Sequence, residues 1–373
     1  MPDTPPVPDT CPRATPAPAP VPVPAYLPVP ADVPVPASGE AEPLTDVSVY
    51  EIGGDRPRPI GVRPEGTVAF YGLVLQARPR NERALVPYLL DRAVDGLWEY
   101  HRGYGVTPED SCLVLDGLLA AGVPADRLRK SADRLVELFF DPGAGAFHSL
   151  SPLRKGRPEL AQGRAAYWAG PGLDATAQSG WALHRIAPDA HAERIADCRR
   201  TVALRQQADG GWCSRWYPSR YVPAYYCLRL LTTAERGHTR ETARAAHWLA
   251  ESQRTDGSWD GTVISTAAAV LSLALLDREP ARRTAALAWL RDRAEPHGEA
   301  PRDGEEQDSE GRWRGEPVLS FWFDFRDGRR LFHHCQDRGR ITTAWARLAL
   351  AAHSAGHPAP GHRADPGGDE RHR

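Results

Sequence analysis

The chain contains little lysine, methionine or cysteine. Among its 373 residues, Lys130 and Lys155 are the only lysines, one residue is methionine, and six are cysteines. The cysteines are scattered and show none of the paired spacings of a disulfide framework or a structural zinc site. This usage argues against a small disulfide-stabilised secreted domain and favours a reduced, cytoplasmic setting.

Long apolar runs and an excess of one charge are also missing. No stretch approaches the roughly 20 apolar residues of a transmembrane helix, and the N-terminus lacks the pattern of a signal peptide. We therefore expect no transmembrane segment, while a peripheral membrane contact stays open. A formal net charge of −2 gives no basic footprint for nucleic acid. The oligomeric state is not determined by the sequence.

Composition divides the chain into three parts. The run from Pro16 to Ala37 consists mostly of Pro, Ala and Val, which favours extended polyproline II and supplies no core. We therefore predict a disordered tail over residues 1–64, one folded domain over residues 65–356, and a disordered C-terminal tail over residues 357–373.

Helical patterns dominate the folded domain, because apolar residues recur at spacings of three and four, as in Leu115, Leu118 and Leu119. Strand signals are limited to Val318–Phe325. The fold is therefore predicted to be all-α, with five or six helix pairs that form either an open solenoid or a closed ring. The predicted helices are 83–98, 108–121, 125–139, 175–186, 190–206, 224–234, 240–253, 265–276, 281–292 and 342–353.

One short motif recurs along this domain. Gln206 to Trp212, Gln253 to Trp259 and Gln307 to Trp313 each read Gln-x-x-x-Gly-x-Trp, with weaker copies at Arg92 to Trp98 and Asp141 to Phe147. A period of roughly 40–50 residues is typical of stacked supersecondary units. The Gly allows a tight turn, the Trp is a large apolar plug, and the Gln can bond backbone groups at helix ends. We interpret the motif as a staple between consecutive helix pairs.

These motifs resemble the QW motifs of squalene-hopene and oxidosqualene cyclases and related class II terpene cyclases. The stretch Trp212-Cys213-Ser214-Arg215-Trp216-Tyr217 is also similar to the Gly-Ser-Trp-x-x-Arg-Trp region of those enzymes. The resemblance covers most of residues 65–356 and implies an α/α toroid of the α6/α6 type, with inner and outer helices around a cavity. It implies inner-helix starts at Pro108, Asp174, Tyr225, Ser265 and Thr342, with the nearby hydroxyls of Ser111, Thr176, Thr266 and Thr343 at one cavity rim.

The same resemblance implies an isomerase or lyase of secondary metabolism that cyclises a linear isoprenoid, its small-molecule partner. Cyclisation would start with protonation of an alkene. No cofactor is required for this chemistry, and Mg²⁺ is expected only if the substrate is a prenyl diphosphate. Arg215, Arg220 or the pair Arg329 and Arg330 could then hold the diphosphate.

The family places its acid in an Asp-x-Asp-Asp-Thr motif at an inner-helix start. Thr107-Pro108-Glu109-Asp110-Ser111 occupies the matching place, which makes Glu109 the implied acid and Asp110 its neighbour, although Thr107 and Glu109 replace two of the Asp residues. Gly172-Leu173-Asp174-Ala175-Thr176-Ala177 keeps only the middle Asp and lies nearer to Trp212, so Asp174 ranks second. An ordinary helix cap explains each carboxylate equally well.

A carbocation route also requires a dry cavity with aromatic walls, because aromatic faces stabilise cations without attacking them. The resemblance and the positions of the aromatic residues give the following substrate-binding candidates: Trp168, Trp216, Tyr217, Tyr221, Tyr225, Phe321, Trp322, Phe323 and Trp345. Phe321 to Phe325 lie outside the helical periodicity and form either the cavity mouth or a buried strand.

Two alternatives to a cyclase stay open. A divergent prenyltransferase-like enzyme would need zinc ligands, but Asp197 and Cys198 are adjacent, and His333-His334-Cys335 lacks spaced partners, so no metal site is predicted. A non-catalytic toroid would bind an isoprenoid or a partner protein. A cavity without a buried, protonated carboxylic acid would favour that alternative.

Overall fold

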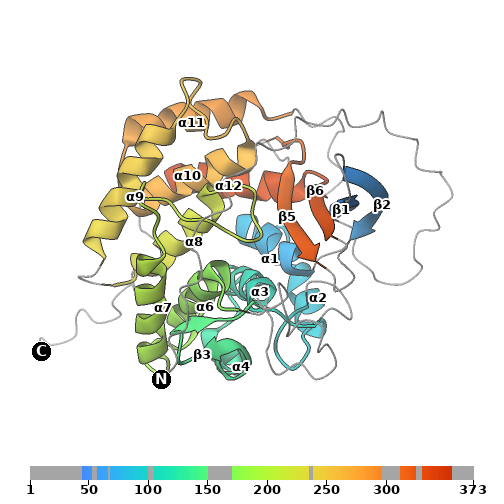
Figure 1. Ribbon diagram of the computed structural model, residues 1–373, viewed down its shortest axis with the longest axis vertical. Coiled ribbons are helices and arrows are strands. Elements are labelled where there is room, and N and C mark those ends of the chain that lie inside the picture. The colour runs from blue at the N-terminus through green and yellow to red at the C-terminus, as the bar shows by residue number, and fades with distance from the viewer. Residues whose placement is uncertain are drawn as a thin grey trace, which may run out of the picture. The chain divides into compact units, whose positions relative to one another are not determined.

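The computed structural model describes residues 44–52, 57–65, 68–99, 105–149, 170–234, 238–295, 311–324 and 330–354. In this part of the chain, six helices pack in sequence order, and the last returns to the first (Figure 1). They are α1 (Val68–Ala77), α3 (Pro108–Ala120), α6 (Leu173–Ile186), α8 (Tyr221–Leu231), α10 (Val263–Leu275) and α12 (Arg340–Ser354). The helices therefore close into a ring, which decides between the two arrangements that periodicity left open.

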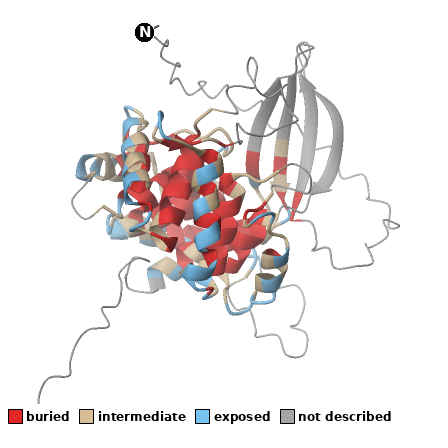
Figure 2. Cartoon of the chain, turned by 90° about the horizontal axis from the view of Figure 1, so that it is seen from below, coloured by how far each residue is buried: buried red, intermediate tan, exposed pale blue. Residues whose placement is uncertain are grey.

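A second set of helices packs against the outside of this ring. These are α2 (Leu85–Asp91), α4 (Arg129–Phe139), α7 (Ala192–Leu204), α9 (Thr239–Ser252) and α11 (Pro280–Asp292), and the short 3₁₀ helix η1 (Ala125–Leu128) precedes α4. Outer helices bury one face, as α9 does with Ala245, Trp248 and Leu249, whereas α10 is buried on almost every side (Figure 2). The alternation of inner and outer helices confirms the predicted α/α toroid.

The repeated motif forms the turn that was predicted for it. Its glycines all have positive φ, namely +84° at Gly96, +59° at Gly145, +103° at Gly210, +90° at Gly257 and +76° at Gly311. This is the left-handed region that glycine enters without a steric penalty. The five turns therefore share one backbone conformation, including the two weaker copies.

The motif's side chains tie helices together. The indole N–H of Trp259 donates to Leu249 O of the preceding outer helix over 2.9 Å, and Trp98, Trp212 and Trp313 donate in the same way to outer-helix carbonyls. Gln253 Nε2 donates to Gly257 O over 2.9 Å and to Arg282 O of the next outer helix over 3.0 Å. The staple interpretation is confirmed.

The hydroxyl groups at the inner-helix starts also belong to the staple. The backbone N–H of Trp259 donates to Thr266 Oγ1 over 3.1 Å, and three further hydroxyls accept from the corresponding N–H groups: Ser111 from Trp98, Thr176 from Phe147, and Thr343 from Trp313. We expected these hydroxyls at the cavity rim. The structure gives each of them a structural role, because each bonds the preceding turn to its inner helix, and their place at the rim stays a prediction.

Helix α1 was not predicted. Its sequence is apolar on nearly every side, so it carries no helical alternation of apolar and polar residues. It crosses α3 very closely, because a Cβ at Gly72 would lie 2.3 Å from Leu113 O and one at Gly117 would lie 2.4 Å from Gly72 O. The two glycines therefore allow the backbones of α1 and α3, the first two helices of the ring, to touch. The helix predicted over residues 83–98 is also shorter, since only α2 is helical there.

A four-stranded antiparallel sheet accompanies the helices, in the order β2-β1-β6-β5. Its strands are β1 (Thr45–Ile52), β2 (Pro57–Glu65), β5 (Pro317–Asp324) and β6 (Arg330–Asp337), and a short pair β3 (Phe140–Asp141) and β4 (Ala146–Phe147) lies apart from it. The strand signal at 318–325 is confirmed as β5. The predicted tail over 1–64 is too long at its end, because β1 pairs with β6, a partner that no local pattern reveals.

The sheet is bonded to the ring through two carboxylates. Glu316, just before β5, accepts from Val263 N over 2.6 Å and from Ile264 N over 2.9 Å at the start of α10. Asp337, the last residue of β6, accepts from Ile341 N over 3.1 Å and from Thr342 N over 2.6 Å at the start of α12. Both are caps of helix N-termini, which favour negative charge.

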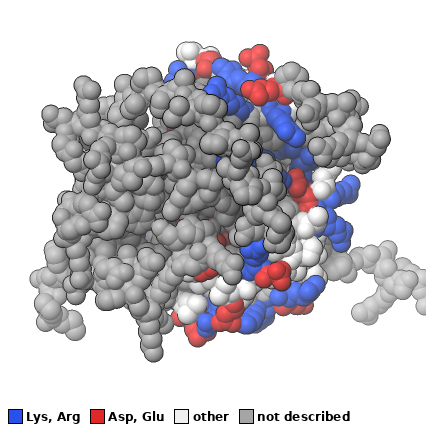
Figure 3. All heavy atoms as spheres, turned by 90° about the vertical axis from the view of Figure 1, so that its right-hand side faces the viewer, with Lys and Arg blue, Asp and Glu red and all other residues white. Residues whose placement is uncertain are grey.

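Two surface properties bear on the predictions. No helix among the described residues is long and apolar enough to cross a membrane. On the face shown in Figure 3, the basic and acidic side chains of described residues are interleaved rather than gathered by sign. The absence of a nucleic-acid partner stays a prediction.

Candidate functional site

The three predicted carboxylates lie at the N-terminal ends of α3 and α6, two neighbouring helices of the inner ring. Asp110 is part of a cap. Its backbone N–H donates to Thr107 Oγ1 over 3.2 Å, and the Thr107 hydroxyl donates back to Asp110 Oδ2. Burial raises the pKa of Asp110 to about 7. Its carboxylate is nevertheless engaged by the cap, as the ordinary reading of a helix start expects.

Glu109 is buried beside Asp110 and has two donors on one oxygen. Ser149 Oγ donates to Glu109 Oε1 over 2.6 Å, and the indole Nε1 of Trp216 donates to the same oxygen over 3.0 Å. Burial raises the pKa of Glu109, against the opposing effect of these hydrogen bonds and of the Arg215 charge. Both donors stabilise the ionised form, so they work against a role as proton donor.

Asp174 is the most deeply buried of the three, with 2% of its surface exposed. Its Oδ2 accepts from Ser214 Oγ over 2.7 Å, whereas its Oδ1 has no hydrogen-bond partner among the described residues. Burial raises its pKa to about 7, and the negative charge of Glu109 acts in the same direction. One oxygen is thus anchored and the other is free to carry a proton.

Ser214 fixes the loop that follows the third motif turn. Its Oγ accepts from the backbone N–H groups of Trp216 and Tyr217, each over 2.9 Å, while its hydroxyl proton goes to Asp174. The loop thereby brings Trp216 to Glu109 and Tyr217 to the ring interior. Sequence reasoning missed Ser149 and Ser214 as site residues. Ser214 was within the quoted stretch, but a lone serine carries no signal of such a contact.

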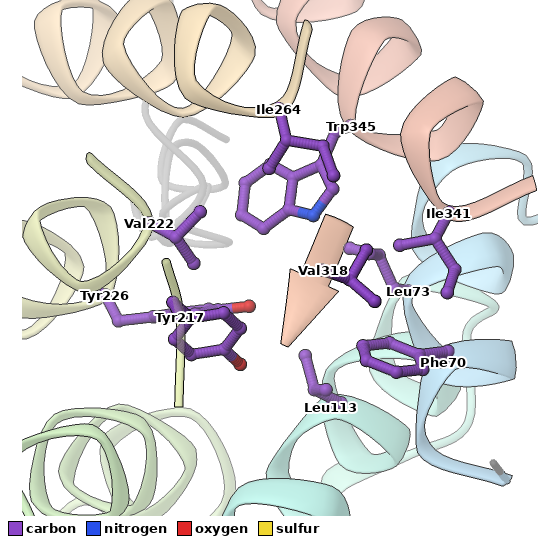
Figure 4. A pocket seen from close by; sticks show the side chains of 10 residues that line it. All are labelled: Phe70, Leu73, Leu113, Tyr217, Val222, Tyr226, Ile264, Val318, Ile341 and Trp345. Atoms are coloured by element: carbon purple, nitrogen blue, oxygen red, sulfur yellow. The ribbon is translucent and has the colours of Figure 1, made fainter. Parts of the chain in front are cut away.

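A small pocket with about 10 Å³ of space lies inside the ring (Figure 4). Its lining is apolar and aromatic: Phe70, Leu73, Leu113, Tyr217, Val222, Tyr226, Ile264, Val318, Ile341 and Trp345. The three carboxylates are not among these residues. Tyr217 lies between the two regions, because it lines the pocket and is also close to Asp174 and Glu109. Burial raises its pKa, and the charges of these two residues add to the effect. Of these residues, sequence analysis named Tyr217 and Trp345 as substrate-binding candidates.

The other aromatic candidates have different fates. Tyr225 is not among the residues that line the pocket, but its ring lies 5.7 Å from that of Trp345, which does line it. Tyr221 is corrected, because it stacks on Trp248 of α9 at 5.0 Å and contacts Trp259, which places it in the packing between α8 and the outer layer. Trp168 lies outside the described residues. For Phe321, Trp322 and Phe323, only the backbone in β5 is described.

A second polar group lies deeper in the ring. Arg229 of α8 forms a buried ion pair with Asp116 of α3 at 2.7 Å, and Trp181 Nε1 of α6 donates to the other Asp116 oxygen over 3.0 Å. The Arg229 guanidinium also lies 4.3 Å from the centre of the Trp181 ring. These contacts join three inner helices. No motif in the sequence indicated them, since the partners are far apart in the chain.

Mg²⁺ was expected only if the substrate is a diphosphate, and the described residues give no support for a site that holds either group. In this part of the chain, no group of three or more His, Cys, Asp or Glu side chains could hold a metal ion. Arg220 is paired with Asp209 at 2.8 Å, and Arg215 donates to Gly170 O and Pro171 O. Arg329 and the side chain of Arg330 lie outside the described residues. We therefore derive no step through Mg²⁺.

Solved structures of other proteins contain a similar ring of helices. The type II terpene cyclase MstE from Scytonema, in complex with geranylgeranyl dihydroxybenzoate, superimposes with a TM-score of 0.60 over 83% of this chain and 91% of that chain, at 15% identity. The fold is that of a class II terpene cyclase. An ent-copalyl diphosphate synthase from Streptomyces platensis superimposes on this cyclase fold with a TM-score of 0.53, at 21% identity, over 79% of this chain and 52% of that chain.

Sequence comparison points the same way over a shorter span. A copalyl diphosphate synthase from Streptomyces cyslabdanicus is 37% identical over 103 residues, which are 25% of this chain and 19% of that protein. A labda-7,13-dienyl diphosphate synthase from Streptomyces clavuligerus is 35% identical over 95 residues, 23% of this chain and 17% of that protein. The match thus spans about a fifth of each curated relative. No family model matches the chain.

Proposed function

We propose that the protein is a class II terpene cyclase that protonates a linear isoprenoid and guides its cyclisation inside the ring. The observation that carries the proposal is Asp174. It is a buried carboxyl with one oxygen anchored by Ser214 and the other without a partner among the described residues. Its pKa of about 7 keeps a large fraction of it protonated near neutral pH.

We propose Asp174 rather than Glu109 as the acid, although the resemblance ranked them in the opposite order. Hydrogen bonds from the Ser214 side chain and the Arg215 backbone also lower the pKa of Asp174, but burial outweighs them. Both donors to Glu109 bond the same oxygen and stabilise its anion. When Asp174 gives up its proton, the Ser214 hydroxyl remains in place to stabilise the resulting carboxylate. Glu109 then raises the pKa of Asp174 through its negative charge, which keeps the acid protonated until substrate binds.

The first step follows from these contacts. The proton on Asp174 adds to the terminal alkene, the π electrons form the new C–H bond, and a tertiary cation results. The next alkene attacks this cation to close a ring. Aromatic faces such as those of Tyr217, Tyr226 and Trp345 can stabilise the moving positive charge, and the aliphatic lining excludes water.

The substrate is proposed to be a prenyl chain with a polar head group. Names of the similar proteins support this class, since three are diphosphate synthases and one structure contains a geranylgeranyl compound. The pocket holds about 10 Å³ of space, far less than the roughly 300–1,000 Å³ of ligand sites. The side chains of its wall must therefore move apart when the substrate enters.

The test is an incubation of the full chain with farnesyl diphosphate, geranylgeranyl diphosphate and a non-phosphorylated polyprene, read by mass spectrometry. Wild type should form a cyclised product from at least one of them. Asp174→Asn should lose it while retaining the folded structure, and Glu109→Gln should retain part of it. Prenyl binding without any product from wild type would instead indicate the non-catalytic toroid.

A further inference from the structure

Gln178 carries a buried amide without a hydrogen-bond partner among the described residues. It lies on α6 with 3% of its surface exposed, and neither its Nε2 nor its Oε1 has a hydrogen-bond partner among the described residues. Leaving a buried polar group without a hydrogen bond is destabilising, and native proteins rarely accept that without a bound water or ligand. The proposed proton transfer does not use this residue.

The position of Gln178 on α6 shows what it faces. Asp174, Gln178 and Trp181 are four and three residues apart, so they form one stripe along the helix. Asp174 bonds Ser214 at the upper end of the stripe, and Trp181 bonds Asp116 at the lower end. Gln178 therefore points into the ring between the acid and the buried ion pair. It lies about 6 Å along the helix axis from Asp174.

We propose that Gln178 holds a water molecule that ends the cyclisation by adding to the carbocation, so that the product is a cyclic alcohol. This inference rests on the proposed function. Two fused six-membered carbon rings span about one helical turn, ~5.4 Å. A cation that starts beside Asp174 and closes two rings along the stripe would therefore end beside Gln178.

Water is the only other reactant that this step needs. Asp174 gives its proton to the alkene and becomes a carboxylate. The water oxygen forms a C–O bond to the final cation, and the proton that it releases returns to Asp174, whose Oδ1 lies one turn away on the same stripe. The net reaction adds one water to the substrate and leaves the acid protonated for the next turnover. Gln178 acts through the water and is a positioning residue.

The experiment uses the full chain in water enriched with ¹⁸O, with geranylgeranyl diphosphate as the probe and mass spectrometry of the dephosphorylated products. Wild type should give a cyclic alcohol that carries one ¹⁸O. Gln178→Leu should lower the ratio of alcohol to cyclic alkene by at least about tenfold, because the water loses its hydrogen bonds. Gln178→Glu keeps an oxygen acceptor and should retain the alcohol.

Two further variants make the result decisive. Gln178→Met, which keeps the length of the side chain, replaces Gln178→Leu if that variant does not fold. Ser179→Ala is the matched control, because Ser179 is buried next to Gln178 but faces Cys112 at 3.7 Å. It should leave the product ratio unchanged.

Each failure has a separate meaning. If wild type forms only a cyclic alkene without ¹⁸O, or if Gln178→Leu and Gln178→Met give the wild-type ratio, the water at Gln178 is structural and the inference is wrong, while the cyclase proposal stands. If wild type forms no cyclised product from any of the three isoprenoids, the proposed function is wrong and the inference falls with it.

Discussion

Trp216 donates its indole N–H to Glu109 Oε1 over 3.0 Å, although the two residues are 107 positions apart in the chain. The bond holds the loop that follows the third motif turn against the start of α3. Because Ser149 bonds the same oxygen, Glu109 is held in place beside Asp174, and its negative charge raises the pKa of Asp174. Replacing Trp216 and replacing Asp174 should therefore have different effects.

Replacement of Trp216 by Phe removes one donor from Glu109. This hydrogen bond lowers the pKa of Glu109, so Trp216→Phe should raise it further above its ordinary value. A carboxyl ¹³C NMR titration measures the shift, with Glu109→Gln identifying the resonance. Trp345→Phe is the control, since Trp345 lines the pocket and Glu109 does not. An unchanged Glu109 titration in Trp216→Phe would refute the contact.

The rate of cyclisation should depend on the protonation of Asp174. Its pKa of about 7 means that kcat/KM should be level at lower pH and fall about tenfold per pH unit above 7, as the acid ionises. Asp174→Asn should reduce the rate by at least about 100-fold. A pH profile of initial rates checks both. A profile that stays level to pH 9 would exclude Asp174 as the acid.

Stability should depend on the same group with a definite sign. The pKa of Asp174 rises from 3.8 to about 7 on folding, so the folded state binds the extra proton between these values. The free energy of unfolding should be greatest near pH 4, fall as pH rises to 7, and then level off, with a total loss on the order of 2–4 kcal/mol. Urea unfolding of wild type and Asp174→Asn measures this.

In that experiment, Asp174→Asn should remove about half of the decline, because burial also raises the pKa of Asp110 from 3.8 to about 7 and that residue keeps its own share. Asp209→Asn is the control, because the Arg220 side chain lowers the pKa of Asp209 and its stabilising effect is present at neutral pH. That variant should keep the decline between pH 4 and 7. Equal pH dependence in wild type and Asp174→Asn would contradict the raised pKa.

The motif glutamines should contribute to stability in proportion to the helices they join. Gln253 bonds its own turn and Arg282 O of α11, so Gln253→Ala should cost about 1–3 kcal/mol in the free energy of unfolding. The side chain of Gln207 donates to Arg205 O, two residues away, over 3.3 Å and reaches no other helix among the described residues. Gln207→Ala should therefore change stability by less than about 0.5 kcal/mol. Thermal and urea unfolding compare the two.

Gly117 should tolerate no side chain. Alanine normally stabilises a helix relative to glycine by about 1 kcal/mol, but a Cβ here would lie 2.4 Å from Gly72 O of α1. Gly117→Ala should instead destabilise the protein by about 1–3 kcal/mol. Gly143→Ala, in an exposed turn where the nearest atom is 3.3 Å away, is the control. A stabilised Gly117→Ala would show that α1 and α3 are further apart.

The parts of the fold that could be predicted are those with local causes. Outer helices such as α9 show the amphipathic period, and the motif turns require Gly at a positive φ, so both leave a pattern in neighbouring residues. Helix α1 is apolar on nearly every side, and β1 pairs with a strand close to the other end of the domain. Neither leaves such a pattern, and both were missed.

The candidate site divides in the same way. Helix periodicity and the motif phase brought Glu109, Asp110 and Asp174 to the starts of two inner helices, which the sequence alone determined. Their different roles depend on partners from distant segments. Thr107 donates a hydrogen bond to Asp110. Glu109 accepts hydrogen bonds from Ser149 and Trp216. Ser214 bonds only one oxygen of Asp174, and the other has no partner among the described residues. Only the closed ring decides this, because burial and hydrogen bonds between distant residues set the protonation of a carboxyl.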